Sequence, residues 1–165
     1  VKNVGEAYFR SYKKEFDLDY TIFRFFNTYG PNQSLDFVIP KFFNAAIKNE
    51  DLIIYGDGSQ TRSFCWIEDN VDTCIKSITD NSTINNVINI GSDVEISIQF
   101  LAQKIIDITG SYSKIQNVAR LKEGDMTRRC PDIAVMKRIL GREPLGLEEG
   151  LIRYFKWYEG RSKSK

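Results

Sequence analysis

Three segments of the sequence carry residue types that could bind a polar ligand. The first is Asn27-Thr28-Tyr29-Gly30-Pro31, which follows a run of strand-forming residues. Ligands of open α/β sheets bind outside the carboxyl ends of the strands, where an Asn amide can donate a hydrogen bond to an oxygen-rich ligand. A turn in which Asn27 bonds its own backbone and Gly30 takes a positive φ would use the same residues. The segment therefore predicts either a ligand contact or a simple turn.

The second segment runs from Tyr55 through the glycine loop Gly56-Asp57-Gly58 to Arg62. The planar guanidinium of an arginine can bind a phosphate through two parallel hydrogen bonds, and a tyrosine ring can stack on a base. The Gly-Lys-Ser/Thr ending of a phosphate-binding P-loop is absent. The alternative is a hairpin-like connection that ends in an exposed arginine.

The third segment, residues 124–132, holds Asp125 and the adjacent pair Arg128 and Arg129. Two neighbouring arginines could close over an anionic ligand, and an acid could hold a ribose. The alternative is solvated charge, with Asp132 placed favourably at the N-terminus of a helix. Each of the three segments is a weak signal alone, and only their combination and order are specific.

The composition excludes several classes of function. The 165 residues are 42% apolar and 27% charged, which indicates a folded domain rather than a disordered tail. The 23 Lys and Arg against 22 Asp and Glu leave a net charge of +1, so no basic field points to nucleic acid. There is no His, and Cys65, Cys74 and Cys130 contain no CxxC pair. We therefore expect no metal site and no Ser-His or Cys-His nucleophile.

The sequence also bears on location. No apolar run approaches the roughly 20 residues that a membrane helix needs, and no signal peptide opens the chain. The cysteine usage fits the reducing cytoplasm. The chain starts at Val1 without a Met and enters a helical pattern at once, from which we expect a piece of a longer protein. We expect a cytoplasmic protein that binds neither membrane nor nucleic acid.

Helical and strand patterns alternate along the chain, which predicts an α/β fold. Val4, Tyr8, Tyr12 and Phe16 recur every four residues on a first helix at 3–16. The run at 20–26 is nearly all apolar and predicts a strand covered on both faces, as in a parallel sheet. The remaining predicted elements are a helix after Pro40, strands at 52–55, 62–67, 87–90 and 115–118, a helix from 68 or 69 to 78, a helix between the N-cap Ser97 and Gly110, a helix with Pro131 in its first turn that stops before Gly141, and a helix at 147–158.

In their order, these segments resemble the NAD-dependent nucleotide-sugar epimerase/dehydratase family of extended short-chain dehydrogenases/reductases. The resemblance covers essentially the whole chain. It rests on Lys2 followed by Gly5-Glu6, on Arg24-Phe-Phe-Asn27-Thr-Tyr29-Gly30-Pro31, on the tract from Ile54 to Phe64, on Glu68-Asp69, on Asn89-Ile90-Gly91, and on Ile139-Leu140-Gly141 with Pro144. Phe64-Cys65 and the 128–132 segment are most similar to UDP-glucuronate decarboxylases, while dTDP-glucose 4,6-dehydratases and UDP-hexose 4-epimerases share most of the remaining pattern.

The resemblance implies that the chain is the C-terminal part of such an enzyme, because the glycine-rich dinucleotide loop and the catalytic Tyr are absent from it. The implied fold is the C-terminal portion of a Rossmann-like NAD(P)-binding fold plus a small α/β substrate-binding lobe. Residues 1–31 would end the Rossmann-like domain, 32–160 would form mainly the substrate lobe with returning Rossmann elements, and 161–165 would be a tail. The helix at 3–16 would then expose its apolar face, and the chain alone would be inactive.

The resemblance also implies a reaction and its residues. The full enzyme would move a hydride from C4 of a hexose onto NAD, form a transient 4-keto sugar, and return the hydride. Lys2 would be catalytic and would hold the cofactor, with Tyr29, Gly30 and Pro31 on the nicotinamide side. The implied contacts to a UDP- or dTDP-hexose are Asn27 to the diphosphate, Tyr55 to the base, Arg62 with Arg128 or Arg129 to the phosphates, and Asp125 to the ribose. We expect Asn27, Tyr55, Arg62 and one of the two adjacent arginines to converge on a single pocket.

Two other functions remain compatible with these residues. One is a noncatalytic nucleotide-sugar-binding fragment, and the other is an NADPH-dependent reductase of a nucleotide-linked keto sugar. Members of the family commonly pair through a four-helix bundle that includes the helix at 3–16, so the resemblance also implies a homodimer. No metal would be needed, because arginines would balance the diphosphate charge.

Overall fold

The computed structural model describes residues 2–79, 81–120 and 129–162. The elements in chain order are α1 (Lys2–Phe16), β1 (Thr21–Phe25), β2 (Thr28–Tyr29), α2 (Val38–Ile47), β3 (Leu52–Tyr55), β4 (Thr61–Arg62), β5 (Cys65–Trp66), α3 (Ile67–Thr79), β6 (Asn86–Ile90), β7 (Ile96–Ser97), α4 (Ile98–Thr109), β8 (Ile115–Val118), α5 (Ala134–Leu140) and α6 (Leu147–Ser162). Helices and strands alternate, which confirms the α/β class.

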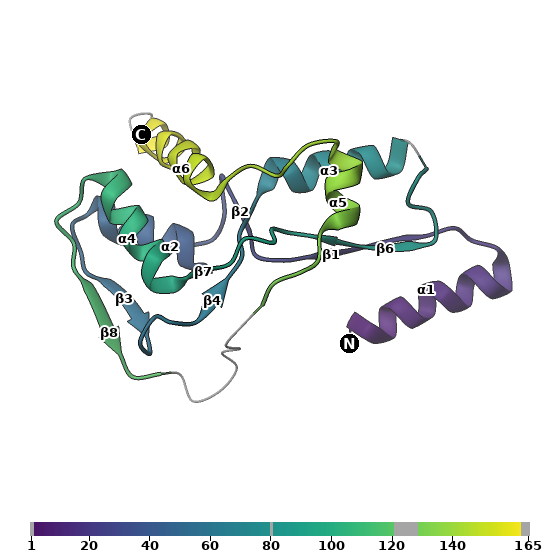
Figure 1. Cartoon of the computed structure of the whole chain (residues 1–165), viewed down its shortest axis with the longest axis horizontal. Helices are drawn as coiled ribbons and strands as arrows, with labels where there is room; N and C mark the ends of the chain where they lie inside the picture. Colours follow the sequence, from purple (N-terminus) through teal and green to yellow (C-terminus); the bar gives the residue numbers. More distant parts are fainter. Residues whose placement is uncertain (1, 80, 121–128, 163–165) are drawn as a thin grey trace.

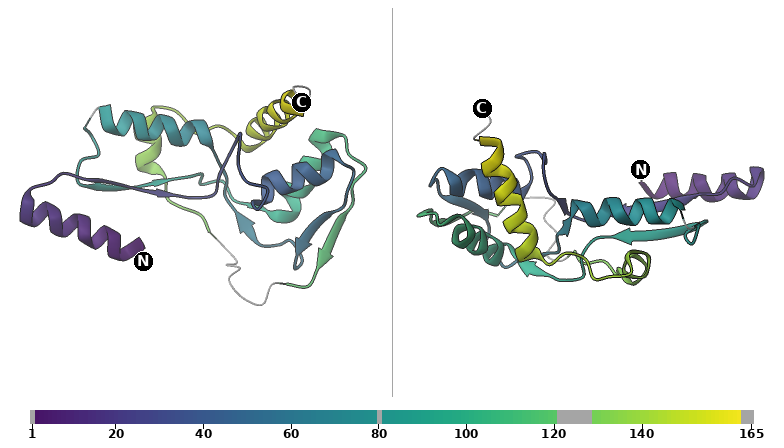
Figure 2. Two further views of the ribbon diagram at one scale, coloured as in Figure 1. Left: turned by 180° about the vertical axis from the view of Figure 1, so that it is seen from behind. Right: turned by 90° about the horizontal axis from the view of Figure 1, so that it is seen from above.

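The elements form two groups that lie side by side (Figure 1). One group contains the parallel pair β1–β6 with α1, α3 and α5, and the other contains the parallel pair β3–β8 with α2, α4 and α6. The short parallel pair β2–β5 lies where the two groups meet, and the antiparallel pair β4–β7 belongs to the second group. Figure 2 shows α1 and the C-terminal end of α6 at opposite ends of the molecule.

Most of the predicted elements are confirmed to within one or two residues. Strands β3 and β8 have the predicted bounds. The side chain of Ser97 accepts a hydrogen bond from the Phe100 N–H at 3.1 Å and caps α4, and Gly110 ends that helix with φ 63°. Gly141 ends α5 in the same left-handed conformation, with φ 70°. Local capping chemistry therefore sets these boundaries.

Three predictions about the elements are wrong. The expected strand at 62–67 is two short strands, because the segments on either side of Ser63 and Phe64 pair with different partners, β7 and β2. Strand β1 is parallel to β6, as predicted, but it is not covered on both faces, since Phe25 is 50% exposed. Pro131 precedes α5 instead of lying in its first turn. The described strands thus form four separate two-stranded sheets rather than one continuous sheet.

Each group has its own hydrophobic core. The larger core is built around Tyr29, Phe43 and Tyr154. The smaller core is built around Ile88 and Ile90 of β6. The members of the smaller core are Cys65, Ile88, Ile90, Ile133, Met136 and Leu140. Since Cys65 and Trp66 are neighbours in β5 and belong to different cores, this short strand joins the two.

A buried carboxylate ties the helices of the two groups together. Asp69, in the first turn of α3, is 1% exposed. It accepts hydrogen bonds from the Arg142 guanidinium at 2.5 Å and from the Leu145 backbone N–H at 2.7 Å. Arg142 also reaches Asp72 at 2.9 Å. A buried charge requires such partners, so this cluster fixes the segment between α5 and α6 against α3.

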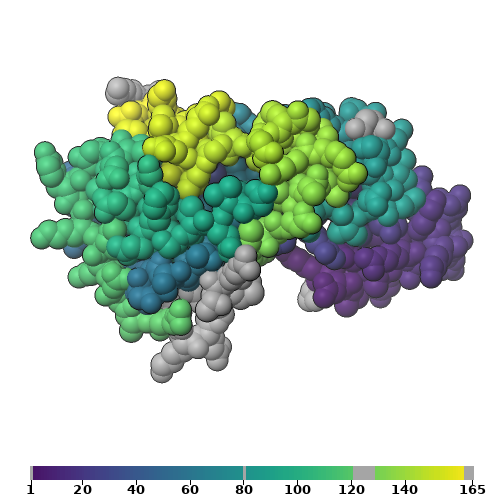
Figure 3. All heavy atoms as spheres, viewed as in Figure 1, coloured from purple at the N-terminus to yellow at the C-terminus, as the bar shows by residue number. Residues whose placement is uncertain are grey.

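Helix α1 leaves its apolar face exposed, as the sequence predicts. Val4, Tyr8 and Tyr12 are each more than half exposed. The helix is joined to β1 by a two-bond ion pair in which the Arg24 guanidinium donates to Glu6 at 2.7 and 2.6 Å. Figure 3 shows α1 forming one end of the molecular surface. In the part of the chain that the structure describes, no helix has the length and apolar character to span a membrane.

Tyr29, in the larger core, lies in close contact with Gly150 of α6. Tyr29 is 2% exposed and packs edge-on against Trp66, with ring centroids 5.5 Å apart. Its hydroxyl donates to the Leu147 carbonyl at 3.4 Å and lies so close to α6 that a Cβ on Gly150 would overlap it. Position 150 therefore requires glycine because of the tyrosine hydroxyl.

We predict that Gly150→Ala lowers the stability of the protein by about 1–3 kcal/mol, the usual cost of overpacking a core. Thermal unfolding followed by circular dichroism measures this. Gly160→Ala is the matched control, because a Cβ at that position of the same helix meets nothing within 4 Å. Adding Tyr29→Phe removes the clashing oxygen and should recover part of the loss. An equal loss with and without the hydroxyl would show that this contact is not the constraint.

Candidate functional site

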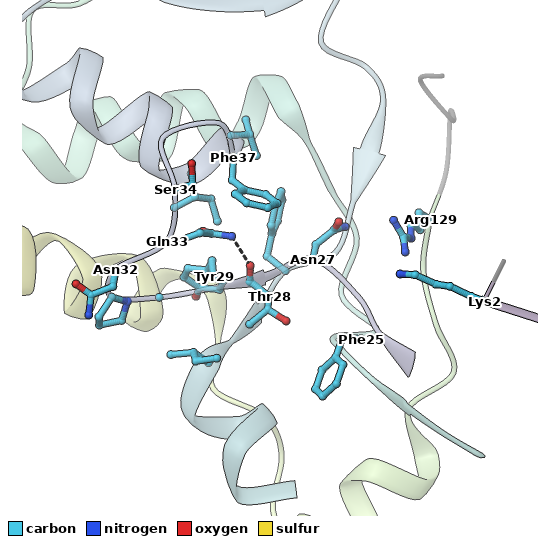
Figure 4. Close-up of a pocket in the computed structure, with 16 residues that line it drawn as sticks. Lys2, Phe25, Asn27, Thr28, Tyr29, Asn32, Gln33, Ser34, Phe37 and Arg129 are labelled. Atoms are coloured by element: carbon cyan, nitrogen blue, oxygen red, sulfur yellow. Dashed lines mark hydrogen bonds between the residues drawn. The ribbon is translucent and has the colours of Figure 1, made fainter. Parts of the chain in front are cut away.

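A cavity of about 690 Å³ lies where β1 ends and the chain turns into β2 (Figure 4). Its size is within the range of small-molecule pockets. The residues that line it are Lys2, Phe25, Asn27, Thr28, Tyr29, Gly30, Pro31, Asn32, Gln33, Ser34, Phe37, Val38, Ile39, Phe64, Ile67 and Arg129. They come from α1, β1, β2, α2, α3 and the segment before α5, so elements of both groups contribute.

The cavity forms where the chain changes strand partners. The Phe26 N–H still donates to the Ile90 carbonyl of β6 at 2.8 Å. One residue later, the Asn27 carbonyl accepts from the Cys65 N–H at 3.1 Å, and the chain continues along β5. The carboxyl end of a parallel strand at such a change of direction is the usual ligand position in α/β proteins. Residues 27–31 therefore lie at the carboxyl end of a parallel strand, where the sequence analysis expected a ligand to bind.

Two cationic side chains and one amide lie at the same end of the cavity. Figure 4 shows the side chains of Lys2 and Arg129 reaching toward the side where Asn27 lies. The Arg129 guanidinium also lies over the Phe26 ring, 5.2 Å from its centroid. Asn27 donates one amide N–H to the Ser63 carbonyl at 3.0 Å, which leaves its second N–H for a ligand. This set of donors suits an anionic, oxygen-rich group such as a phosphate.

A hydrogen-bonded network that the sequence did not reveal holds one wall of the cavity. The Gln33 amide donates to the Thr28 carbonyl at 2.7 Å, and the Asn70 amide donates to the Thr28 hydroxyl at 2.5 Å. Gln33 stands in what reads as an ordinary polar loop, and Asn70 stands in a helix 42 residues away from Thr28. No spacing rule connects these positions, so only the tertiary structure shows their relation.

The Tyr29-Gly30-Pro31 turn borders the cavity, but its best-defined roles are in packing. The Tyr29 ring is buried in the larger core, and this burial raises the pKa of its phenol well above the ordinary value. A Cβ on Gly30 would overlap the Ile67 side chain, so the close approach of α3 requires glycine here. Contact with a cofactor through this turn stays a prediction.

The expected convergence on a single pocket is found for some of the residues only. Asn27 and Arg129 line the cavity together with Lys2, whereas Tyr55 and Arg62 do not line it. Arg62 is half-buried in β4 and donates to the Thr61 carbonyl at 2.7 Å. Tyr55 is 39% exposed at the end of β3.

The two remaining predicted site residues, Asp125 and Arg128, lie outside the described residues. The roles assigned to all the site residues from the resemblance stay predictions. Among the described residues, no three His, Cys, Asp or Glu side chains gather in a way that could hold a metal ion.

Comparison with protein families gives a match to the NAD dependent epimerase/dehydratase family over residues 1–91. A UDP-glucuronic acid decarboxylase 1 from Danio rerio is 36% identical over 160 residues, which is 93% of this chain and 38% of that protein. A UDP-N-acetyl-alpha-D-glucosaminuronate decarboxylase from Bacillus cytotoxicus is 38% identical over 120 residues, 69% of this chain and 37% of that protein. The chain thus spans well under half the length of these curated relatives.

Solved structures agree with this assignment. A UDP-glucose 4-epimerase from Thermotoga maritima, determined with UDP-glucose, superposes with a TM-score of 0.90 at 28% identity, over 98% of this chain and 52% of that one. A UDP-glucuronic acid 4-epimerase from Bacillus cereus, in complex with UDP-glucuronic acid and NAD, has a TM-score of 0.84 at 27% identity, over 95% of this chain and 50% of that one. The Rossmann-like α/β fold and NAD as the cofactor of the family are therefore confirmed.

One part of the sequence prediction needs correction. The assignment of the chain to the C-terminal part of a family member, and of its fold to the C-terminal portion of a Rossmann-like domain with a substrate lobe, is contradicted. The family match starts at residue 1 and covers residues 1–91, so the part of this chain that carries the family signature is its N-terminal part. The place of this chain within a longer family member was predicted from motifs that the chain lacks. The family match depends instead on the residues that the chain contains.

Cys65 and Tyr154 give a prediction about pH. Burial, aided by the nearby Asp69 charge, raises the pKa of the Cys65 thiol from 9.0 to about 12, and burial raises that of Tyr154 from 10.0 to about 12. Above pH 9 the unfolded chain loses protons that the folded protein keeps. The contribution of Cys65 to stability is therefore fully present below pH 9 and that of Tyr154 below pH 10. Both contributions fall as the pH rises toward 12, each by up to about 1.4 kcal/mol per pH unit.

Urea unfolding at a series of pH values measures this loss. Cys65→Ala should show a shallower decline than the unsubstituted protein, because one of the buried groups that keep their protons in the folded state is removed while Tyr29 and Tyr154 remain. A stability that stays constant from pH 9 to 11 would contradict the protonated, buried state of both side chains.

Proposed function

This chain belongs to the NAD-dependent epimerase/dehydratase family, and on that premise we propose that it binds a nucleoside-diphosphate sugar for an NAD-dependent conversion of the sugar. The observation that carries the proposal is the meeting of Lys2, Asn27 and Arg129 in one cavity at the carboxyl end of β1. The relatives are named for decarboxylation or epimerisation of UDP-linked sugars, which supports UDP as the nucleotide. Since the chain spans between about a third and about a half of their length, the conversion is proposed for the whole protein.

The cavity has donors that fit the nicotinamide end of NAD. Lys2 supplies an ammonium group that can donate hydrogen bonds to ribose hydroxyls, and the Gly30-Pro31 turn forms an apolar wall. When bound, NAD supplies a hydride acceptor for C4 of the sugar and returns the hydride later in the cycle. The contribution of this chain is to hold the sugar and the nicotinamide against each other and to limit access of water.

The polar end of the cavity suits the diphosphate. Arg129 can donate two parallel hydrogen bonds to a phosphate, and the free N–H of Asn27 can donate a third. The tyrosine of the cavity, Tyr29, is buried and donates to a backbone carbonyl, so it is not placed to act as a proton acceptor. We therefore expect the 165-residue chain to bind a UDP-sugar without converting it.

Two further features belong to the proposal. Among the described residues the three cysteines form no disulfide, which supports a cytoplasmic location. The exposed apolar face of α1 supports a homodimer, because contiguous apolar surface of this kind commonly marks a protein–protein contact. Phe9 and Phe16, which are also more than half exposed, enlarge the face formed by Val4, Tyr8 and Tyr12.

We predict that Arg129→Ala weakens the binding of UDP by about tenfold to a hundredfold, the loss expected for a charge-assisted hydrogen bond. Isothermal titration of the 165-residue chain with UDP measures it. Arg138→Ala is the control, because Arg138 is exposed on α5 and does not line the cavity. Equal affinities for all three proteins would remove Arg129 from the site, and the absence of UDP binding to the unsubstituted chain would refute the proposed function.

We predict that the chain forms dimers that depend on α1. Replacing Tyr8 and Tyr12 by Glu places charges on the apolar face and should give a monomer in light scattering coupled to size-exclusion chromatography. Replacing the exposed Tyr112, which lies outside α1, by Glu should leave the dimer intact. A monomeric unsubstituted protein, or dimers in both variants, would contradict an interface on α1.

A further inference from the structure

A second cavity, of about 460 Å³, lies beside the C-terminal half of α6. Four side chains of that helix line it, and the turn at 32–35 lines it as well. The four are Tyr154, Trp157, Tyr158 and Arg161. Residues 32–34 also border the first cavity, whereas Lys2, Asn27 and Arg129 line only the first. The two cavities therefore share one wall and differ in the groups that could bind a ligand.

The Tyr154 hydroxyl is a buried polar group without a hydrogen-bond partner. Tyr154 is 1% exposed, and its hydroxyl bonds to none of the residues that the structure describes. Burial is the main reason that the pKa of this phenol rises to about 12; Tyr158 adds to the rise and Arg161 opposes it. Both of these residues line the second cavity, which places the hydroxyl on the cavity side. At neutral pH the hydroxyl is protonated and can donate to a ligand.

The second cavity also holds a cation and a set of aromatic rings. The Arg161 guanidinium lies over the Trp157 ring, with its central carbon 5.6 Å from the ring centroid. Arg161 forms no ion pair with any described residue. Neither Asp nor Glu occurs among the described residues that line the cavity. Its charge therefore favours an anion.

Both walls of this cavity are held in place by contacts elsewhere in the chain. The Tyr154 ring packs on Phe43 of α2, with ring centroids 5.0 Å apart. The Tyr158 hydroxyl donates to Asn44 Oδ1 of the same helix at 3.3 Å. On the other wall, the Gln33 amide is bonded to the Thr28 carbonyl. A ligand would meet a preformed site, so little of its binding free energy would be lost in ordering the chain.

We propose that the second cavity binds a small molecule that carries a carboxylate on a six-membered ring. The carboxylate accepts hydrogen bonds from the Arg161 guanidinium and the Tyr154 hydroxyl, and the flat face of the ring packs against Trp157. Core packing at position 154 needs only a phenyl ring, and buried hydroxyls are normally hydrogen-bonded, so an external acceptor accounts for the tyrosine. This site does not depend on the proposed function.

The experiment follows the indole N–H signals of the two tryptophans in NMR spectra of the isotopically labelled 165-residue chain. Trp157 lines the cavity, while Trp66 is 3% exposed in the larger core and serves as the internal reference. Benzoate and methyl β-D-glucuronide are titrated separately, which distinguishes an aromatic ring from a sugar ring. Benzamide and methyl β-D-glucoside are their uncharged counterparts.

At least one of the two carboxylates should shift the Trp157 signal to saturation and leave Trp66 unmoved, and its uncharged counterpart should bind at least tenfold more weakly. The carboxylate that binds more tightly identifies the ring. Arg161→Met and Tyr154→Phe should each weaken its binding by about tenfold, because each removes one charge-assisted hydrogen bond. Lys156→Met is the matched control, since Lys156 is exposed on α6 and does not line the cavity.

Thermal unfolding of Tyr154→Phe separates a binding role of the hydroxyl from a structural one. Because the hydroxyl has no partner among the described residues, its removal should leave the unfolding midpoint unchanged or raise it. A lower midpoint would assign the hydroxyl to the fold and overturn the inference.

Three binding results would also overturn it. The first is a Trp157 signal that neither carboxylate shifts, and the second is equal binding by the unsubstituted chain, Arg161→Met and Tyr154→Phe. The third is binding that Arg129→Ala abolishes and Arg161→Met leaves intact, which would place the carboxylate in the first cavity. None of these results bears on the binding of UDP, so the proposed function would stand.

Discussion

The contact between the Tyr29 ring and the glycine of α6 is the constraint on which the site depends. The ring is enclosed by Phe64, Trp66 and Gly150, and its hydroxyl bonds the backbone at the start of α6. The two residues before it, Asn27 and Thr28, therefore leave β1 in a fixed direction. The cavity lies beside this fixed strand end, so its shape depends on the packing of the larger core.

A second constraint sets how the helices surround that strand end. Asp69 is buried, and its charge is balanced by Arg142 and by the Leu145 N–H. Removing one partner of a buried charge pair typically costs about 3–5 kcal/mol, whereas an exposed pair contributes far less. The Asp69 cluster and the Tyr29 contact act on the same segment of chain from its two ends. Together they hold α3 and α6 against the wall of the cavity.

The sequence predicts those features that depend on neighbouring residues. The helix caps at Ser97 and Gly110 and the bounds of β3 and β8 follow from local chemistry, and the structure confirms them. The division of 62–67 into two strands depends on which partner each half meets, which is a property of the tertiary structure. The coverage of β1 was overestimated for the same reason, because an apolar run shows that a strand can be buried and not what covers it.

In the candidate site, too, the sequence predicts individual residues better than it predicts which of them lie together. Asn27 was identified from its place after a strand, Arg129 from the pair of adjacent arginines, and Lys2 from the resemblance. All three line the cavity. Tyr55 and Arg62 do not line the cavity. Their spacing along the chain could not show that they lie apart from Asn27, Lys2 and Arg129. Gln33 and Asn70, which hold the cavity wall, could not be found without the fold.

The most direct test of the account is the location of the ligand in solution. Backbone amide NMR spectra of the isotopically labelled 165-residue chain, recorded during titration with UDP-glucuronic acid, report which residues sense the ligand. We expect the largest changes on the strand end and turn at 27–34 and on Arg129. Changes confined to the exposed face of α1 or to α5, with the 27–34 amides unmoved, would contradict the assignment of the cavity as the nucleotide-sugar site.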